Sequence, residues 1–365
     1  MLVCRRDTAR LRSSSIRRSQ RVPHFSFHVA PKHRAFARRY DGFVPDSHSD
    51  AVMNPVNLAQ LLLLAALWGG SFLFIRVGVT DLDVAPLMAL RVGIGAAFLL
   101  IVLLVRGSPR EAFATMRRRA WPLLVVGVFN SAAPFCLFAY AELTLSAGVT
   151  SVINATTPLW GALVAYLWLG DRLSRLRVAG LAIGFAGVMA LVWDQMFAHD
   201  GSMSATTPMT TALAALAALA ATLCYGIAAS YTKRHLMGVD SLTVAAGTMS
   251  AATIVLLPFA LVAWPAGAVS FTAWGAVLGL GIACTGVAYM VFFHLIAVAG
   301  PARAITVTFV IPIFGILWGA LFLGEHVSAG MAAACTVVLA GTALATGVVK
   351  RLPLVRGRRA ACAKQ

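Results

Sequence analysis

Long apolar runs separated by short polar links dominate the chain from about residue 57 onward. A helix that crosses a bilayer needs about 20 apolar residues, and ten runs are long enough. The runs are rich in Leu, Ala and Gly and lack the alternating pattern of a membrane β-strand. We therefore predict an all-α integral membrane protein with ten transmembrane helices, at about residues 57–79, 86–105, 121–141, 147–169, 176–193, 211–232, 242–263, 273–298, 302–323 and 328–349.

The stretch from Gly148 to Trp193 occurs a second time, farther along the chain. With a shift of 154 residues, Pro158 matches Pro312, and the L-G-D that ends at Asp171 matches the L-G-E that ends at Glu325. Self-similarity at one fixed shift over so long a run is typical of an internal repeat. The ten helices therefore form two repeats of five.

Lysine and arginine lie on one side of these helices. They occupy the links after the second, fourth, sixth and eighth runs and the C-terminal tail, whereas the opposite links carry acids such as Asp81, Asp83 and Glu325. Basic loops stay in the cytoplasm, so this split predicts a multi-pass protein with both termini cytoplasmic. Five helices per repeat is an odd number, so the second repeat enters from the other side. The sequence thus predicts inverted-topology repeats, the architecture of many secondary transporters.

The domain organisation follows from these runs. Residues 1–52 are a basic leader, for which we expect disorder. It is either an organellar transit peptide or upstream sequence outside the native protein, and we favour Met53 as the true start. The remaining segments are the first repeat at 53–193, an external linker at 194–210, the second repeat at 211–349 and a basic cytoplasmic tail at 350–365.

Composition narrows the class of protein. With 59% hydrophobic and 12% charged residues, the chain has too much apolar surface for a soluble protein of 365 residues. The net charge of +17 invites a nucleic-acid function, but the basic residues lie in links and tails and form no basic face on a soluble domain. The six cysteines show no C-x-x-C spacing, so we expect no metal site, no disulfide framework and no cofactor.

The motifs resemble those of one known family. W-G-x-x-F from Trp68 to Phe72, together with Pro158 and the duplicated L-G-[DE] ending, is similar to the EamA family of the drug/metabolite transporter superfamily, over about residues 55–349. The resemblance implies a ten-helix carrier. In that fold the first, third, fourth, sixth, eighth and ninth helices surround a central cavity, and the fifth and tenth lie nearer the periphery. It also implies that the substrate is an amino acid, a related metabolite or a drug, mostly exported.

Prolines inside the apolar runs indicate where such a cavity lies. A proline leaves the carbonyl four residues earlier without its donor, and unpaired backbone in a bilayer must line a cavity or be buried in protein. The carbonyls freed by Pro134, Pro158 and Pro312 belong to polar residues, so we expect Pro158 and Pro312 to act as hinges. Kinks that serve packing alone are the alternative. The predicted substrate-binding residues are Trp68, Ser71, Asn130, Asn154, Thr157, Tyr225 and Thr308.

Charged groups within the runs are the remaining candidates, because an ionisable group in a membrane helix is costly. Arg76 and Arg91 either contact a substrate carboxylate or pair with the nearby Asp81 and Asp83. No carboxylate lies at the membrane centre, which favours uniport or weak coupling and leaves antiport open. The candidates for charge or proton coupling are Arg76, Arg91, Glu142 and His294.

The sequence therefore predicts a secondary transporter of the cytoplasmic membrane that exports a small organic solute by alternating access. The alternatives are a membrane receptor or scaffold without transport and a nucleotide-sugar-type carrier of the same superfamily. An enzyme is not expected, because no paired carboxylates or clustered histidines lie at membrane depth. The expected partners are the solute and the lipid bilayer. The small-residue stretch from Gly180 to Gly187 serves either an internal helix contact or a homodimer.

Overall fold

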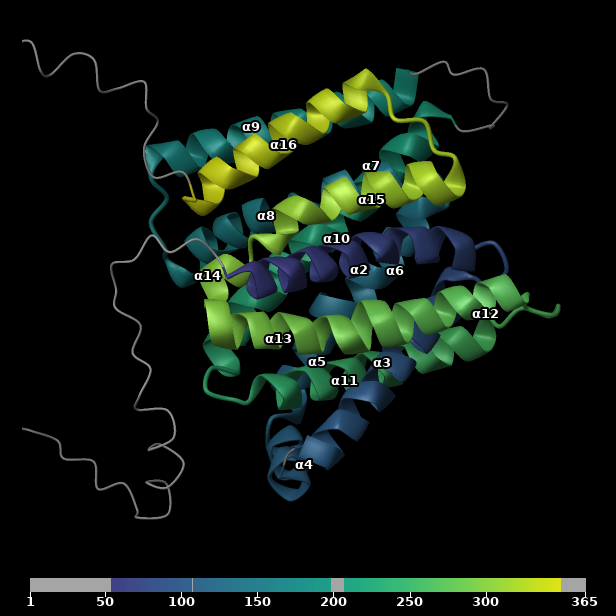
Figure 1. The fold of residues 1–365 in the computed structure, drawn as a ribbon, viewed down its shortest axis with the longest axis vertical. Helices are drawn as coiled ribbons and strands as arrows, with labels where there is room; N and C mark the ends of the chain where they lie inside the picture. Colours follow the sequence, from purple (N-terminus) through teal and green to yellow (C-terminus); the bar gives the residue numbers. More distant parts are fainter. Residues whose placement is uncertain (1–53, 107, 198–206, 349–365) are drawn as a thin grey trace, which may run out of the picture. The chain divides into compact units, whose positions relative to one another are not determined.

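Helices account for nearly all of the described chain, which comprises residues 54–106, 108–197 and 207–348 of a computed structural model (Figure 1). These ranges contain no strand, and they hold ten helices long and apolar enough to cross a membrane. Many outward apolar side chains are exposed, such as Ile101, Met189 and Leu257. Lipid, unlike water, covers such a surface without cost. The predicted fold class is thus confirmed. The leader at 1–52 and the tail at 350–365 lie outside the described residues, as do residues 198–206 of the linker.

The first repeat provides five membrane spans and one short amphipathic helix, α4, in the link after the second span. The elements are α2 (Pro55–Gly78), α3 (Val84–Arg106), α4 (Pro109–Arg118), the third span α5 (Ala120–Gly127), η2 (Val128–Ala132) and α6 (Ala133–Glu142), the fourth span α7 (Ala147–Asn154), α8 (Thr157–Val164) and η3 (Ala165–Leu169), and the fifth span α9 (Arg175–Phe197).

The second repeat has the same order of spans without the amphipathic helix. Its elements are α10 (Pro208–His235), α11 (Ser241–Val262), the eighth span α12 (Phe271–Leu278), η4 (Gly279–Val287) and α13 (Ala288–Ala299), the ninth span α14 (Pro301–Ala304) and α15 (Val307–Leu323), and the tenth span α16 (Ala329–Thr346). The π-helical segments η2 and η4 occupy corresponding places in the third and eighth spans.

The glycines of the duplicated L-G-[DE] motif end the fourth and ninth spans. Gly170 has φ 72° and Gly324 has φ 66°, the left-handed conformation that terminates a helix and that glycine adopts without steric cost. The motif therefore requires glycine for a backbone reason. The side chain of the acid that follows each glycine is not needed to end the helix.

Glycines also join the two repeats to each other. A Cβ atom on Gly69 of α2 would lie 2.9 Å from the backbone nitrogen of Gly315 in α15. In the same way, a Cβ atom on Gly226 of α10 would lie 3.0 Å from the nitrogen of Gly161 in α8. Each repeat thus contributes a helix that packs backbone to backbone against the other repeat. We call these two contacts the exchanged glycine contacts.

Small residues of the fifth span pack against the tenth span. A Cβ atom on Gly341 of α16 would lie 2.5 Å from the Cα of Gly184 in α9, and Gly180 contacts the backbone near Ala345. Helices α9 and α16 therefore run side by side at one edge of the described bundle (Figure 1), and both also contact α7. The glycines of the stretch from Gly180 to Gly187 therefore serve an internal helix contact, which is one of its two predicted roles.

Candidate functional site

A cavity of about 350 Å³ lies between the two repeats. Helices of the first, second, third, fourth, sixth, eighth and ninth spans contribute its wall, and the fifth, seventh and tenth contribute none. The resemblance predicted that six of these seven spans surround the cavity. The second span, α3, is the one that it did not predict. All seven residues predicted to bind substrate line this one cavity, namely Trp68, Ser71, Asn130, Asn154, Thr157, Tyr225 and Thr308.

Asn130 lies in the π-helical segment η2 of the third span. Pro134 follows at the start of α6, so the backbone cannot continue the regular α-helical hydrogen bonds there. Widened π turns of this kind often occur at functional sites. The Asn130 side-chain nitrogen donates to the hydroxyl of Tyr289 at 3.3 Å, which joins the third and eighth spans across the cavity wall.

Asn154 and Thr157 flank an interruption of the fourth span. Helix α7 ends at Asn154 and α8 begins at Thr157, and Pro158 cannot donate to the carbonyl of Asn154. The hydroxyl of Thr157 donates to that carbonyl instead, at 2.8 Å. The freed backbone group is therefore satisfied locally, and both residues face the cavity.

The ninth span is interrupted at a different place. Helix α14 ends at Ala304, α15 begins at Val307, and Thr308 donates through its hydroxyl to the carbonyl of Ile305 at 2.8 Å. Pro312 lies farther on, inside the continuous α15. The two prolines predicted as hinges thus have different settings, and only Pro158 adjoins a helix break.

Aromatic rings form most of the apolar wall. Trp68 contacts Phe292 with ring centroids 5.2 Å apart, and Phe138 lies 5.8 Å from Phe72 and 6.1 Å from Tyr225. The wall therefore offers flat apolar surfaces beside a small number of polar groups, which is typical of a site for a small organic molecule.

Arg91 is the one charged residue in the cavity wall among the described residues. Its side chain is buried, with the guanidinium carbon 3.7 Å from the centre of the Phe135 ring and Nε donating to the Thr285 hydroxyl at 3.4 Å. No described carboxylate lies within ion-pair distance of it. The expectation that Arg91 pairs with Asp81 or Asp83 is therefore wrong.

Arg76 and Asp81, near the end of the first span, form hydrogen bonds with different residues. Arg76 donates through Nη1 to the backbone carbonyl of Glu142. The Asp81 carboxylate, in the loop after α2, accepts from the backbone nitrogen of Ser270 at 2.8 Å. Hydrogen bonding from the side chain and the backbone of Ser270 lowers the pKa of Asp81 below the usual value for aspartate. The expected ion pair between Arg76 and Asp81 or Asp83 is thus also wrong, and Arg76 does not line the cavity.

Two acids lie together at the same end of the bundle. Glu142 is fully buried, and neither carboxylate oxygen has a hydrogen-bond partner among the described residues; its charged neighbours are Glu325, Arg76 and Arg91. The Glu325 carboxylate accepts from the backbone nitrogens of Ala147 at 2.7 Å and Gly148 at 3.0 Å, the first two residues of α7. The second L-G-[DE] acid thus ties the end of the ninth span to the start of the fourth.

His294, the last coupling candidate, lies apart from these groups. Its side chain is exposed on α13 and does not line the cavity. The four candidates are therefore spread over three places: Arg91 in the cavity wall, Arg76 and Glu142 at the end of the bundle near α7, and His294 on the outside.

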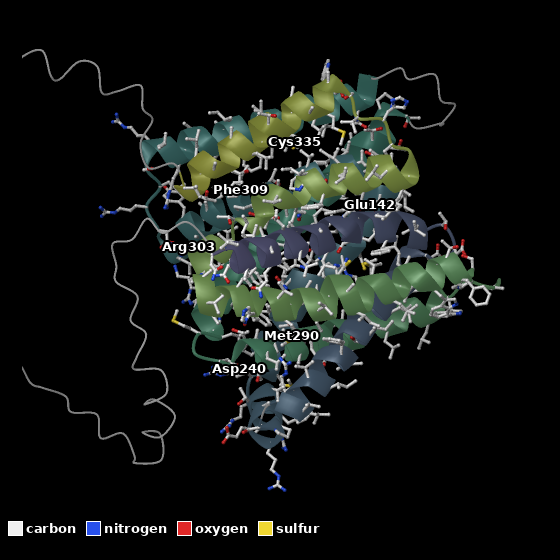
Figure 2. All side chains as sticks on the ribbon, in the orientation of Figure 1. Glu142, Asp240, Met290, Arg303, Phe309 and Cys335 are labelled. Atoms are coloured by element: carbon white, nitrogen blue, oxygen red, sulfur yellow. The ribbon has the colours of Figure 1, made fainter. Side chains whose placement is uncertain are left out.

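The two ends of the cavity differ in access. At the end where α10 finishes and α15 begins, the lining residues Ala229 and Ile305 are exposed, the latter by 49%. At the opposite end Phe72, Ile311 and Phe138 are at most 5% exposed. Figure 2 shows Arg303 and Glu142 toward these two ends. The cavity wall is therefore exposed at the Arg303 end and buried at the Glu142 end, and we refer to the Glu142 end as closed.

Sequence reasoning missed several lining residues that the repeat itself indicates. The 154-residue shift carries Asn130 to Cys284 and Phe135 to Tyr289, and all four line the cavity. Applying the shift to the candidates would have found Cys284, the counterpart of Asn130, and Ile311, the counterpart of Thr157. Arg91 has no such counterpart, because the seventh span contributes nothing to the wall.

Ten helices in two repeats around a central cavity define a polytopic carrier-type membrane protein. Comparison with known families is more specific: the EamA-like transporter family matches residues 58–193 and again 212–347. These matches cover more than half of the chain, so the chain belongs to the EamA-like transporter family, as the motifs indicated.

Similar proteins carry transporter names. The "uncharacterized transporter YoaV" of Bacillus subtilis is 20% identical over 80% of this chain and 97% of its own length. A "probable terminal-alkyne amino-acid exporter" of Streptantibioticus cattleyicolor is 29% identical over 54% of this chain and 62% of its own length. A solved crystal structure superposes with a TM-score of 0.57 at 22% identity, over 82% of this chain and 99% of that one, which supports the fold.

Proposed function

We propose that this protein exports a small organic solute by alternating access, with the solute bound in the cavity between the repeats. One observation carries the proposal: a single cavity gathers polar and aromatic groups from both repeats, and it is accessible from one end and closed at the other. Secondary transporters with inverted repeats bind substrate at such a place. The exporter name of the Streptantibioticus relative supports the outward direction.

Closure of the Glu142 end depends on polar contacts as well as on packing. The bonds from Ala147 and Gly148 to Glu325 and from Arg76 to the Glu142 carbonyl all lie there, and each joins two different spans. In the proposed cycle these contacts break when the cavity opens at this end. Rocking about the helix break at Pro158, with Pro312 bending α15, would couple the two ends.

The proposed location is the cytoplasmic membrane, with both chain ends in the cytoplasm. Support comes from the distribution of lysine and arginine, which favours a cytoplasmic position for the Arg303 end of the cavity. A relative from Escherichia coli, 23% identical over 73% of this chain, is named an "uncharacterized inner membrane transporter". The cavity in this structure would then be open to the compartment from which an exporter loads.

The proposal is tested by solute flux with the full chain in liposomes. The panel consists of radiolabelled amino acids, organic acids, amines and sugars, with and without a pH gradient. Flux of one class, reduced by Asn154→Ala and by Thr308→Ala, is the expected result. The control is Thr336→Ala, which removes an exposed hydroxyl that bonds within α16. Specific binding without flux would instead support the receptor alternative.

A further inference from the structure

The charge in the cavity wall is unbalanced. Arg91 provides one positive charge, and no described aspartate or glutamate lines the cavity. Glu142 influences Arg91 electrostatically, but it does not line the cavity and forms no ion pair with it. A buried cation without a counter-ion in contact is costly, and ionisable residues inside a membrane commonly mark the path of a substrate or ion.

Resting on the proposed transport function, we infer that the transported solute is a monoanion, with a carboxylate held by Arg91 and an apolar body held by the aromatic wall. No amino group is required. A zwitterionic or cationic solute would bring an ammonium group into a cavity whose described wall already carries the Arg91 charge and has no carboxylate to balance a second cation.

The contacts of Arg91 leave its donors available for this purpose. Within the described part of the chain, its one hydrogen bond uses Nε and reaches Thr285. The two terminal nitrogens of a guanidinium carry four further N–H groups in a fork that fits a carboxylate. Phe135 lies against the guanidinium at 3.7 Å and holds it in place.

The position of Arg91 also explains why the charged end of the solute would bind at one side of the cavity and its apolar body at the other. Arg91 comes from α3, whereas the rings of Trp68, Phe72 and Phe138 come from α2 and α6. The seventh span, the repeat counterpart of α3, contributes no residue to the wall. The cavity is therefore charged on the Arg91 side alone, and an amphiphilic anion fits with its charged end there.

The test measures binding inside the cavity, independently of flux. Ala229 lines the cavity and is exposed, so a chain that carries Ala229→Cys, with all six native cysteines replaced by alanine, reports ligand by protection of that one cysteine from iodoacetamide. Four probes share one phenyl ring: phenylpropionate, its neutral amide, phenethylamine and phenylalanine. We expect phenylpropionate to protect at about ten to a hundred times lower concentration than the amide, the usual effect of a charge-assisted hydrogen bond.

Substitutions test whether Arg91 causes the preference for phenylpropionate over its amide. Arg91→Gln should abolish the preference for phenylpropionate, and Arg91→Lys should keep part of it. Arg234→Gln removes an exposed arginine that does not line the cavity, and it should leave the order of the probes unchanged. Each result is a ratio between probes within one variant, so it does not depend on how much folded protein each variant yields.

The outcomes separate this inference from the proposed transport. Stronger protection by phenethylamine or phenylalanine, an equal effect of all four probes, protection by none of them, or an unchanged order in Arg91→Gln would each overturn the inference. Protection by phenylpropionate that depends on Arg91 supports it, even if liposome flux is absent. In that case the transport proposal fails and the anion site stands.

Discussion

Replacing Glu325 by alanine should open the closed end of the cavity. The Glu325 carboxylate holds the backbone nitrogens of Ala147 and Gly148, and the Ser146 hydroxyl holds that of Val149. Together these groups satisfy the first three N–H groups of α7, which have no partner within the helix. Glu325→Ala removes two of the three bonds and leaves the local cap by Ser146 intact.

The magnitude follows from these two bonds. A hydrogen bond to a charged group contributes about 1.5–3 kcal/mol, and a helix-capping side chain about 0.5–2 kcal/mol. Glu325 is partly exposed, so we assign about 2 kcal/mol to the pair of bonds together. At about 1.4 kcal/mol per factor of ten, the population closed at this end should fall about 30-fold relative to the open one.

Access to Cys284 from the closed end measures that shift. A chain that keeps Cys284 as its one cysteine is placed in membrane vesicles of known orientation, and a membrane-impermeant methanethiosulfonate is added on the Glu142 side. Glu325→Ala should raise the labelling rate by about 30-fold. Glu111→Gln is the control, since it changes an exposed acid of α4, far from the cavity wall.

An unchanged labelling rate in Glu325→Ala would refute the reasoning. It would mean that the buried rings of Phe72 and Phe138 close this end by packing alone. A faster rate from both sides of the membrane would also count against it, because that pattern indicates general loosening and not a shift between two closures.

Three further predictions concern the fold and its motion. Gly341→Ala places a Cβ against the backbone of α9 and should lower the free energy of unfolding by about 1–3 kcal/mol. The control is Gly275→Ala, whose Cβ would have nothing within 4 Å and should leave the free energy of unfolding unchanged. Thermal unfolding in detergent compares the two variants. Pro158→Ala should slow solute flux while membrane insertion is kept, and an unchanged rate would remove the hinge. Hydrogen bonding to Ser270 lowers the pKa of Asp81, so the ionised carboxylate stabilises the fold above about pH 4. This stabilisation is lost as the pH falls through the lowered pKa. Asp81→Asn should therefore flatten the acid part of the thermal stability profile.

The spans and the repeat could be predicted because they depend on local composition. A run such as 86–105 must be long and apolar to cross a bilayer, and α3 occupies Val84–Arg106. The polar residues near prolines were also predictable, since a freed carbonyl marks a place where the backbone needs another partner. Asn154 and Thr308, which were predicted in this way, line the same cavity.

Partners in the folded chain could not be predicted in the same way. Nothing near Arg76 in sequence shows that it reaches the carbonyl of Glu142, or that Asp81 accepts from the backbone nitrogen of Ser270. The π-helical segments η2 and η4 were missed because they change the hydrogen-bond spacing of the backbone without a strong residue preference. Hydropathy does not distinguish a helix that lines a cavity from one that faces lipid.

The exchanged glycine contacts determine which parts of the molecule can move as rigid bodies. Gly69 fixes α2 of the first repeat against α15 of the second, and Gly226 fixes α10 against α8. Separating residues 55–197 from residues 208–346 as two blocks would pull apart backbones that touch with no side chain between them. In the proposed transport cycle, the moving units would therefore combine helices from both repeats. The sequence contains two copies, but the boundary between them would not be the line along which the chain bends in that cycle.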